Sequence, residues 1–162
     1  MGLDMYLEAR KYVSQYDYSK WTDRTGDIPV NEEFNNIKAL FPALLTDNTE
    51  SGATVAINVG YWRKANAIHE WFVQNVQDGE DNCREYRVTK EQLTALRDAC
   101  EDVLNDPDNA AEILPTQSGF FFGDTEYGEF YFEDVRRTRD MLDNFLDNGY
   151  ADEYDFYYSS SW

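Results

Sequence analysis

The amino-acid sequence predicts an α+β fold, in which a small, mostly antiparallel sheet packs against about three or four helices. Apolar residues alternate with polar ones at both ends of the chain, which is the pattern of half-buried strands. Between the ends, apolar residues recur every three or four positions in several segments, which is typical of amphipathic helices. No repeat or linker divides the 162 residues, so we expect a single domain over residues 1–162.

The first half of the chain predicts two strands and two helices. Residues 3–9 (LDMYLEA) alternate and form an N-terminal strand. A short helix follows Asn31 and ends before Pro42. Residues 54–59 (TVAINV) are rich in β-branched side chains and predict a further strand. A longer helix is expected over residues 61–76, with a core-facing stripe of Ala65, Ile68, Phe72 and Val76.

The second half predicts two further strands and two clear helices. Residues 85–88 (EYRV) form a short strand. The capping-box pattern TKEQ at residues 89–92 opens a helix that ends at the sequence Asp-Pro-Asp of residues 106–108. A second helix covers residues 133–148 and stops at Asn-Gly. Residues 154–159 (YDFYYS) alternate again, and we expect this C-terminal strand to neighbour the N-terminal one.

Net charge limits the classes of function. The chain has 32 Asp and Glu against 14 Lys and Arg, a formal charge of -18 at pH 7. Because 42% of its residues are hydrophobic and 16% are aromatic, it is nevertheless predicted to fold. The charge disfavours direct binding to nucleic acid or to an anionic membrane, and it favours a partner with a basic surface. A salt-adapted or GC-rich source organism explains the same acidity without any partner.

Other residue counts exclude several kinds of site. No segment approaches the roughly 18 apolar residues of a membrane span, and the opening MGLDMYLEAR lacks a secretory pattern, so we expect a cytoplasmic protein. Cys83 and Cys100 are too few for a disulfide framework or a zinc site. The single histidine, His69, excludes a centre with several histidine ligands. We expect neither a metal nor a cofactor.

A first candidate for ligand binding is one edge of the helix expected over residues 61–76. Trp62, Asn66 and His69 share this edge beside the core stripe, where they could stack on a planar ligand and hydrogen-bond to it. A boundary histidine bonded to a backbone carbonyl, next to a tryptophan that fills the core, explains the same pattern without a ligand. The helical wheel leaves both interpretations open.

A second candidate is the segment of residues 114–128, LPTQSGFFFGDTEYG. Its three consecutive phenylalanines lie between glycines and cannot all face one core, so a binding loop and a buried hairpin both fit. In a ligand pocket, Arg63, Lys64 or Arg84 would neutralise an anionic group. The candidate ligand-binding residues are Trp62, Arg63, Lys64, Asn66, His69, Gln117, Ser118, Phe120, Phe121, Phe122 and Tyr127.

Catalysis finds little support in the sequence. Ser118 lacks the surroundings of a nucleophile elbow, and its segment lacks the Gly-Lys-Ser/Thr end of a phosphate-binding loop. Carboxylates are so numerous that their mere presence does not indicate a catalytic pair. We therefore expect a protein that is not an enzyme, with a small enzyme as an alternative.

Three stretches of the chain resemble a small family of acidic proteins encoded by bacteriophages and prophages. They are MGLDMYLE, VGYWRKANAIHEWFVQNVQDGEDNCREYRVTKEQL and LPTQSGFFFGDTEYGEFYFEDV, and the signature WRKAN-IH-WF is the most specific part. Some members carry a phosphoglycerate kinase label, which does not suit a chain far too short for a two-lobed kinase. The resemblance implies a phage origin and assigns no catalytic residue.

Charge and resemblance together predict a phage accessory protein that binds and neutralises a host factor in the cytoplasm of the infected bacterium. Such a counter-defence inhibitor would present carboxylates where a nucleic-acid-binding protein expects phosphates. The alternative is a sponge that binds a nucleotide-derived immune signal through an aromatic and basic pocket. The expected acidic face comprises Asp140, Asp143, Asp147, Asp152, Glu153 and Asp155.

Overall fold

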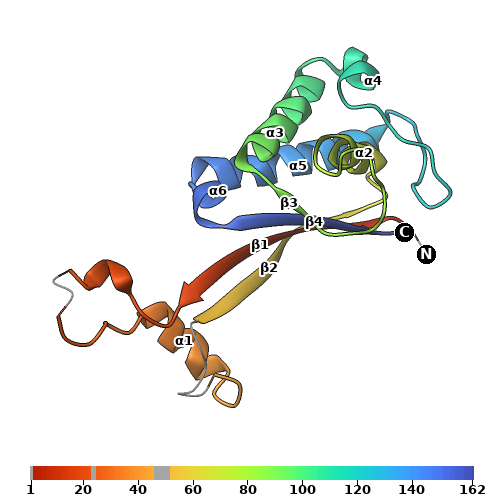
Figure 1. The fold of residues 1–162 in the computed structure, drawn as a ribbon. Coiled ribbons are helices and arrows are strands. Elements are labelled where there is room, and N and C mark those ends of the chain that lie inside the picture. The colour runs from red at the N-terminus through yellow and green to blue at the C-terminus, as the bar shows by residue number, and fades with distance from the viewer. Residues whose placement is uncertain (1, 23–24, 46–51) are drawn as a thin grey trace. The chain divides into compact units, whose positions relative to one another are not determined.

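A computed structural model describes residues 2–22, 25–45 and 52–162 of the chain, and Figure 1 shows it as a ribbon. In chain order the elements are β1 (Asp4–Ser14), a 3-10 turn η1 (Tyr18–Lys20), α1 (Glu32–Leu40), β2 (Gly52–Arg63), α2 (Asn66–Asn75), β3 (Tyr86–Val88), α3 (Lys90–Asn105), a second 3-10 turn η2 (Pro107–Asn109), α4 (Ala110–Ile113), α5 (Glu129–Asp147), α6 (Tyr150–Glu153) and β4 (Asp155–Ser161).

The strands form one antiparallel sheet in the order β2-β1-β4-β3, which confirms the predicted α+β class and the pairing of the terminal strands. The alternation of apolar and polar residues along each strand explains which of its two faces is buried. In β1, Met5 and Leu7 are fully buried while Tyr6 between them is only partly covered. In β4, Phe156 and Tyr158 are buried in the same way, and they pair with Val88 and Tyr86 of β3.

Helices α2, α3 and α5 lie on the same side of the sheet (Figure 1), and the main core lies between them and the strands. The ring of Phe72 from α2 stacks on Tyr158 of β4 with a centroid separation of 3.9 Å. Leu93 and Leu96 of α3 and Leu142 of α5 are fully buried, as their helical spacing predicts. Burial of such apolar side chains is the main source of stability of this layer.

The caps predicted from the sequence are present. The Thr89 side chain accepts a hydrogen bond from the Gln92 backbone, and the Gln92 side chain accepts one from the Thr89 backbone. Gly149 follows α5 in the left-handed region with φ 73°, as a helix stop requires. Helix α5 begins directly after Gly128, four residues earlier than the expected Glu133.

The expected helix over residues 61–76 is correct only from Asn66 onward. Its first residues extend β2 instead, because Trp62 is 1% exposed while Tyr61 and Arg63 on either side are exposed, a two-residue period. Lys64 ends the strand: its backbone amide still donates to the Leu3 carbonyl at 2.8 Å, but its φ of 60° turns the chain into α2.

Contacts within the chain divide it into two compact units, the major unit (residues 1–9 and 57–162) and the minor unit (residues 10–56). The major unit holds nearly all of the buried hydrophobic residues. The minor unit carries five Lys or Arg and seven Asp or Glu, a formal charge of -2, so -16 of the total -18 belongs to the major unit. Charge and core are therefore both concentrated in the major unit.

Candidate functional site

A cleft with a volume of about 390 Å³ lies in the major unit, where β2 gives way to α2. The start of α2, the loop of residues 116–126 and the first two turns of α5 form its walls. Charges of both signs line it, since Arg63 and Lys64 face the same space as acidic side chains of the loop and α5. The acidic lining residues are Asp124, Glu126, Glu133 and Asp134.

Asn66 organises the cleft rather than pointing freely into it. This side chain is 4% exposed, and its amide donates to the carbonyls of Phe122 at 2.9 Å and Asp124 at 2.8 Å. Its oxygen accepts from the backbone amide of Gln117 at 3.0 Å. One side chain thus satisfies three backbone groups of the loop and fixes it against the start of α2.

The same loop approaches β2 closely at Gly123. This glycine has φ 88°, and a Cβ built on it would lie 3.2 Å from the Cβ of Lys64. A side chain here would have to adopt an unfavourable backbone conformation and displace Lys64. Gly123 is therefore required for the close fit of the cleft wall.

Asp134 is a partly buried carboxylate on the α5 wall of the cleft. Its burial raises the pKa of the carboxyl group, and nearby Arg137 opposes that rise. The Asp134 backbone carbonyl accepts from the Thr138 hydroxyl at 2.7 Å, and that hydroxyl accepts from the Trp62 indole at 2.7 Å. The indole nitrogen of Trp62 is therefore hydrogen-bonded even though the side chain is buried in the core.

His69 lies in the core as well, with an exposed fraction of 0%. Its Nδ1 lies 2.7 Å from the Tyr158 hydroxyl and its Nε2 lies 3.1 Å from an oxygen of Asp81. In the neutral form of the imidazole, Nε2 carries the proton, because the carboxylate can only accept, and Nδ1 accepts from Tyr158. The other Asp81 oxygen accepts from the Trp162 indole at 3.0 Å, so the histidine links α2 to the end of β4 through one polar network.

The structure brings only part of the predicted ligand site together. Arg63, Lys64 and Asn66 line the cleft, whereas Trp62 and His69 are buried away from solvent. Phe120 is 94% exposed, while Phe122 packs on the core and meets the His69 ring edge-on at 5.2 Å. The remaining candidates do not line the cleft: Gln117, Ser118 and Phe121 belong to the loop, and Tyr127 directly follows it.

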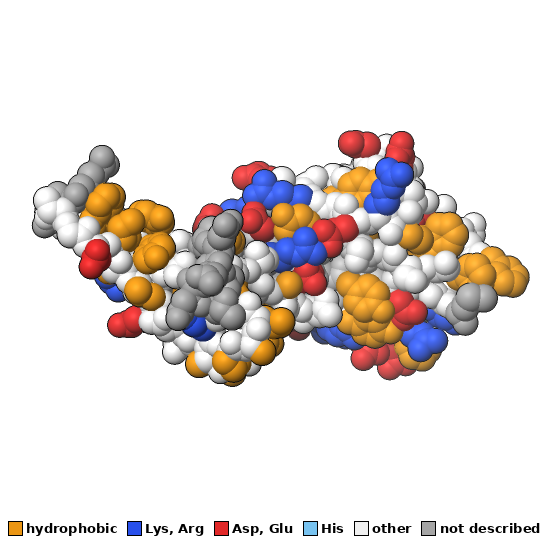
Figure 2. Space-filling view, turned by 60° about the horizontal axis from the view of Figure 1, so that its bottom comes forward, with side chains coloured by type: hydrophobic (Ala, Val, Ile, Leu, Met, Phe, Trp, Pro, Cys, Tyr) orange, Lys and Arg blue, Asp and Glu red, His pale blue; other side chains and the backbone are white. Residues whose placement is uncertain are grey.

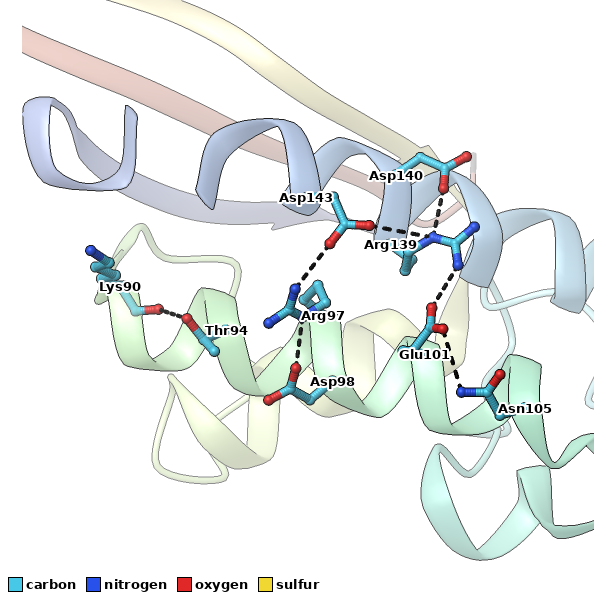
Figure 3. A network of polar contacts seen from close by, with 9 residues as sticks. All are labelled: Lys90, Thr94, Arg97, Asp98, Glu101, Asn105, Arg139, Asp140 and Asp143. Atoms are coloured by element: carbon cyan, nitrogen blue, oxygen red, sulfur yellow. Dashed lines mark hydrogen bonds and ion pairs between the residues drawn. The ribbon is translucent and has the colours of Figure 1, made fainter. Parts of the chain in front are cut away.

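Ion pairs occupy most of the predicted acidic face. Arg139 of α5 bonds Glu101 and Asp140 at 2.6 Å each, and it lies 3.6 Å from Asp143 (Figure 3). Arg97 of α3 reaches the other oxygen of Asp143 at 3.1 Å. Hydrogen bonds to Asp98 and Asp143 raise the pKa of Arg97. Hydrogen bonds to Glu101 and Asp140 raise the pKa of Arg139 in the same way. The network joins α3 to α5 and neutralises part of the face.

Ion pairs also form at the other end of the predicted acidic face. Lys90 bonds Asp152 at 2.6 Å, and Arg87 bonds Asp155 at 2.6 Å. Among the described residues, Asp147 and Glu153 are thus the two members of the predicted face without an ion pair. Figure 2 shows the same mixing on the face in view, where acidic and basic side chains lie next to one another.

A different segment carries acidic charge that, among the described residues, is compensated by ion pairs only at Asp98 and Glu101. Between Arg97 and Arg136 the sequence has 38 residues, of which 11 are Asp or Glu and none is Lys, Arg or His. The segment covers the end of α3, η2, α4, the loop and the start of α5. The total charge of the chain does not reveal this segment, because it does not say where along the chain the charges lie. The long gap between basic residues is nevertheless visible in the sequence alone.

Stability does not explain this acidity at the end of α3. The C-terminus of a helix carries partial negative charge, so Asp102 and Asp106 there oppose the helix dipole. Asp102, Asp108 and Glu112 are exposed, and none of their side chains takes part in an ion pair within the described chain. Phe130, 78% exposed, adds an apolar side chain at the start of α5. We call residues 98–135 the acidic segment.

No group of three or more His, Cys, Asp or Glu in the described residues is arranged to hold a metal ion. Likewise, no helix in the described ranges combines the length and the apolar character that crossing a membrane demands. Comparisons of the chain with protein-family models, with curated proteins and with solved structures give no match. The phage resemblance accordingly remains an expectation from the sequence.

Proposed function

We propose that this protein is a non-enzymatic binder of a partner with a basic surface, and that the acidic segment is the surface that binds. The observation that carries the proposal is the run from Asp98 to Val135, which has 11 carboxylates and no basic residue. A surface of one sign speeds the encounter with a partner of the opposite sign and selects against wrong partners. The phage resemblance makes a host protein that handles nucleic acid the proposed target.

Exposed aromatic side chains within the same segment support a protein partner. Phe120 and Phe130 are 94% and 78% exposed, although large apolar side chains are usually buried. Binding energy at protein interfaces is concentrated in a few residues that become desolvated, with charged groups around them setting orientation and rate. Carboxylates next to exposed aromatic rings fit this division of roles.

Salt-dependent capture tests the proposal. Immobilised protein is incubated with lysate of the bacterial host at low and at high salt, and we expect a basic protein to be retained only at low salt, since salt screens exposed charges. Its affinity is then measured with purified components. Failure to recover any basic partner at low salt would contradict the proposal.

Matched variants locate the surface. Two double variants each remove one Asp and one Glu carboxylate that are exposed and have no ion pair within the described chain. They are Asp108→Asn/Glu112→Gln and Asp147→Asn/Glu153→Gln. The first pair lies in the acidic segment and the second on the face predicted from sequence. We expect the first pair to slow association by about tenfold and the second by much less. Equal effects would mean that net charge, not a defined surface, drives binding.

The cleft supports the small-ligand alternative as a second proposal. Arg63 and Lys64 would neutralise an anionic group such as the phosphate of a nucleotide-derived signal, while Asp124 and Asp134 in the same cleft oppose it. A thermal-shift panel of nucleotides and cyclic dinucleotides tests this, because a ligand of the native state raises the melting temperature. A shift that Lys64→Gln abolishes would support the cleft, and no shift with any compound would exclude this class.

A further inference from the structure

A second hollow of the major unit lies inside the acidic segment. It is a groove of about 520 Å³ between the end of α3 and the first two turns of α5. Its lining residues are Leu104, Pro107, Glu129, Phe132, Glu133 and Arg136. The groove therefore brings an early and a late part of the acidic segment to one place.

The packing of α3 against α5 leaves an apolar floor in this groove. The ion pair between Glu101 of α3 and Arg139 of α5 holds the two helices together (Figure 3). Beyond this pair, Leu104 on α3 and Phe132 on α5 line the groove. Both side chains are only partly buried, because they pack on the core and also face the groove. The chain itself thus leaves part of this apolar surface uncovered.

Acidic side chains stand around the apolar floor. Glu129 and Glu133 line the groove from α5, and both are exposed without an ion pair within the described part of the chain. On the α3 side, Asp106 and Asp108 directly adjoin the lining proline in the chain. Arg136 is the basic member of the lining and opposes them. Four carboxylates therefore outnumber one guanidinium group at this place.

The end of α3 lacks the basic side chain that would stabilise it. The last carbonyl groups of a helix carry partial negative charge, and a Lys or Arg in the last turn is favourable there. The last turn of α3, all of which the structure describes, has no such residue, and Asp106 ends the helix. A positive charge from another molecule would be attracted by the helix dipole and by the carboxylates together.

We propose that the groove binds a peptide segment of the partner in which an apolar side chain is flanked by Lys or Arg. The apolar side chain covers Leu104 and Phe132, and the flanking cations meet the carboxylates and the end of α3. A second copy of this chain does not suit the groove, because its charge of -18 opposes docking among carboxylates. This inference rests on the proposed function, since it assigns a binding site for the same basic partner.

Two synthetic peptides of equal length and equal charge test this proposal on the full chain. One has leucines between its lysines (Lys/Leu) and the other has serines there (Lys/Ser). We expect the Lys/Leu peptide to bind about tenfold more tightly, because a leucine side chain is removed from water. In NMR spectra of the labelled protein, its amide shift changes should be concentrated in residues 103–108 and 129–136. Equal affinities, or changes concentrated at the exposed Leu40 and Leu44 instead, would overturn the proposal.

Variants separate the contributions of the floor and of the charge. Phe132→Ala shortens the floor and should remove most of the advantage of the Lys/Leu peptide, with binding of the Lys/Ser peptide unchanged. Arg136→Gln removes the opposing cation and does not depend on the floor remaining intact, so it also decides the question if Phe132→Ala disturbs the fold. It should tighten binding of the Lys/Leu peptide more than Arg84→Gln, which removes an exposed arginine outside the groove. Equal effects of the two arginine variants would overturn the assignment to the groove.

Failure of this inference is distinguishable from failure of the proposed function. A basic host protein that is captured, but whose dissociation rate is the same for Phe132→Ala and the wild type, would overturn only the groove, because apolar contacts act mainly on dissociation. Binding of neither peptide at low salt, together with no partner from the lysate, would contradict both.

Discussion

Replacing His69 tests whether this residue serves the core or a ligand. The side chain is 0% exposed and both ring nitrogens have partners, so we expect His69→Gln to lower the stability of the protein without contributing directly to binding. Glutamine can reach only one of the two partners from the same backbone position. Either the buried Tyr158 hydroxyl or one of the two Asp81 oxygens therefore loses its hydrogen bond to residue 69, while the other Asp81 oxygen keeps its bond from Trp162.

The size of the effect follows from these contacts. A typical hydrogen bond contributes about 1 kcal/mol, and leaving a buried partner unsatisfied costs about 1 to 3 kcal/mol. Loss of the edge-on contact between the His69 ring and Phe122 adds to this. We expect His69→Gln to reduce the free energy of unfolding by about 2 kcal/mol, which for a chain of this size lowers Tm by about 4 to 8 °C.

Urea unfolding followed by circular dichroism measures this change. Gln74→Ala, on the exposed side of the same helix, is the control and should shift the free energy of unfolding by less than about 0.5 kcal/mol. Tyr158→Phe removes the reciprocal partner, and the double variant should cost less than the sum of the two single changes. An unchanged urea midpoint for His69→Gln, or fully additive effects in the cycle, would refute the structural role.

Two further predictions concern the loop and the alkaline limit of stability. Asn66→Ala removes three hydrogen bonds to the loop of residues 116–126, so unfolding free energy should fall by about 2 kcal/mol and hydrogen exchange should accelerate in that loop first; unaltered exchange there would contradict the role of Asn66. Burial raises the pKa of the Cys100 thiol from 9.0 to about 12, so the folded state keeps its proton where the unfolded state has lost it. The stability contributed by this group is therefore complete below pH 9 and is lost as the pH rises toward 12, by at most about 1.4 kcal/mol per pH unit. Chemical denaturation from pH 8 to 11 should show a shallower alkaline loss for Cys100→Ala than for the wild type, and identical slopes would count against this assignment.

Local periodicity was sufficient to predict most of the secondary structure. Each of these elements has a sequence pattern that fits either a strand or a helix but not both. They are the strands at both termini, the capped helix α3 and helix α5 with its apolar stripe. Residues 61–65 were assigned wrongly because Trp62 fits a helical edge as well as a buried strand position. The backbone hydrogen bond from Lys64 to Leu3 decides between them, and such a contact between distant segments is not visible in a local pattern.

Residue types predicted the chemistry of the candidate site better than its location. Arg63, Lys64 and Asn66 do meet at a cleft, because they flank the junction between β2 and α2. The sequence could not show that the Asn66 side chain forms its hydrogen bonds with the backbone of the loop. Nor could it show that Asp134 on α5 lines the same cleft as Arg63 and Lys64. Both facts depend on how segments about 50 to 70 residues apart pack together, and side-chain packing is a property of the whole fold.

The sequence by itself determined the α+β class, the total charge of -18 and the absence of basic residues from the acidic segment. Tertiary structure decided which carboxylates remain uncompensated. Arg97 comes close to Asp143, and Arg139 to Glu101, only because α3 packs on α5, so charges that are separate along the chain cancel in space. Composition adds charges without regard to distance, whereas Coulomb attraction depends on the separation that folding creates.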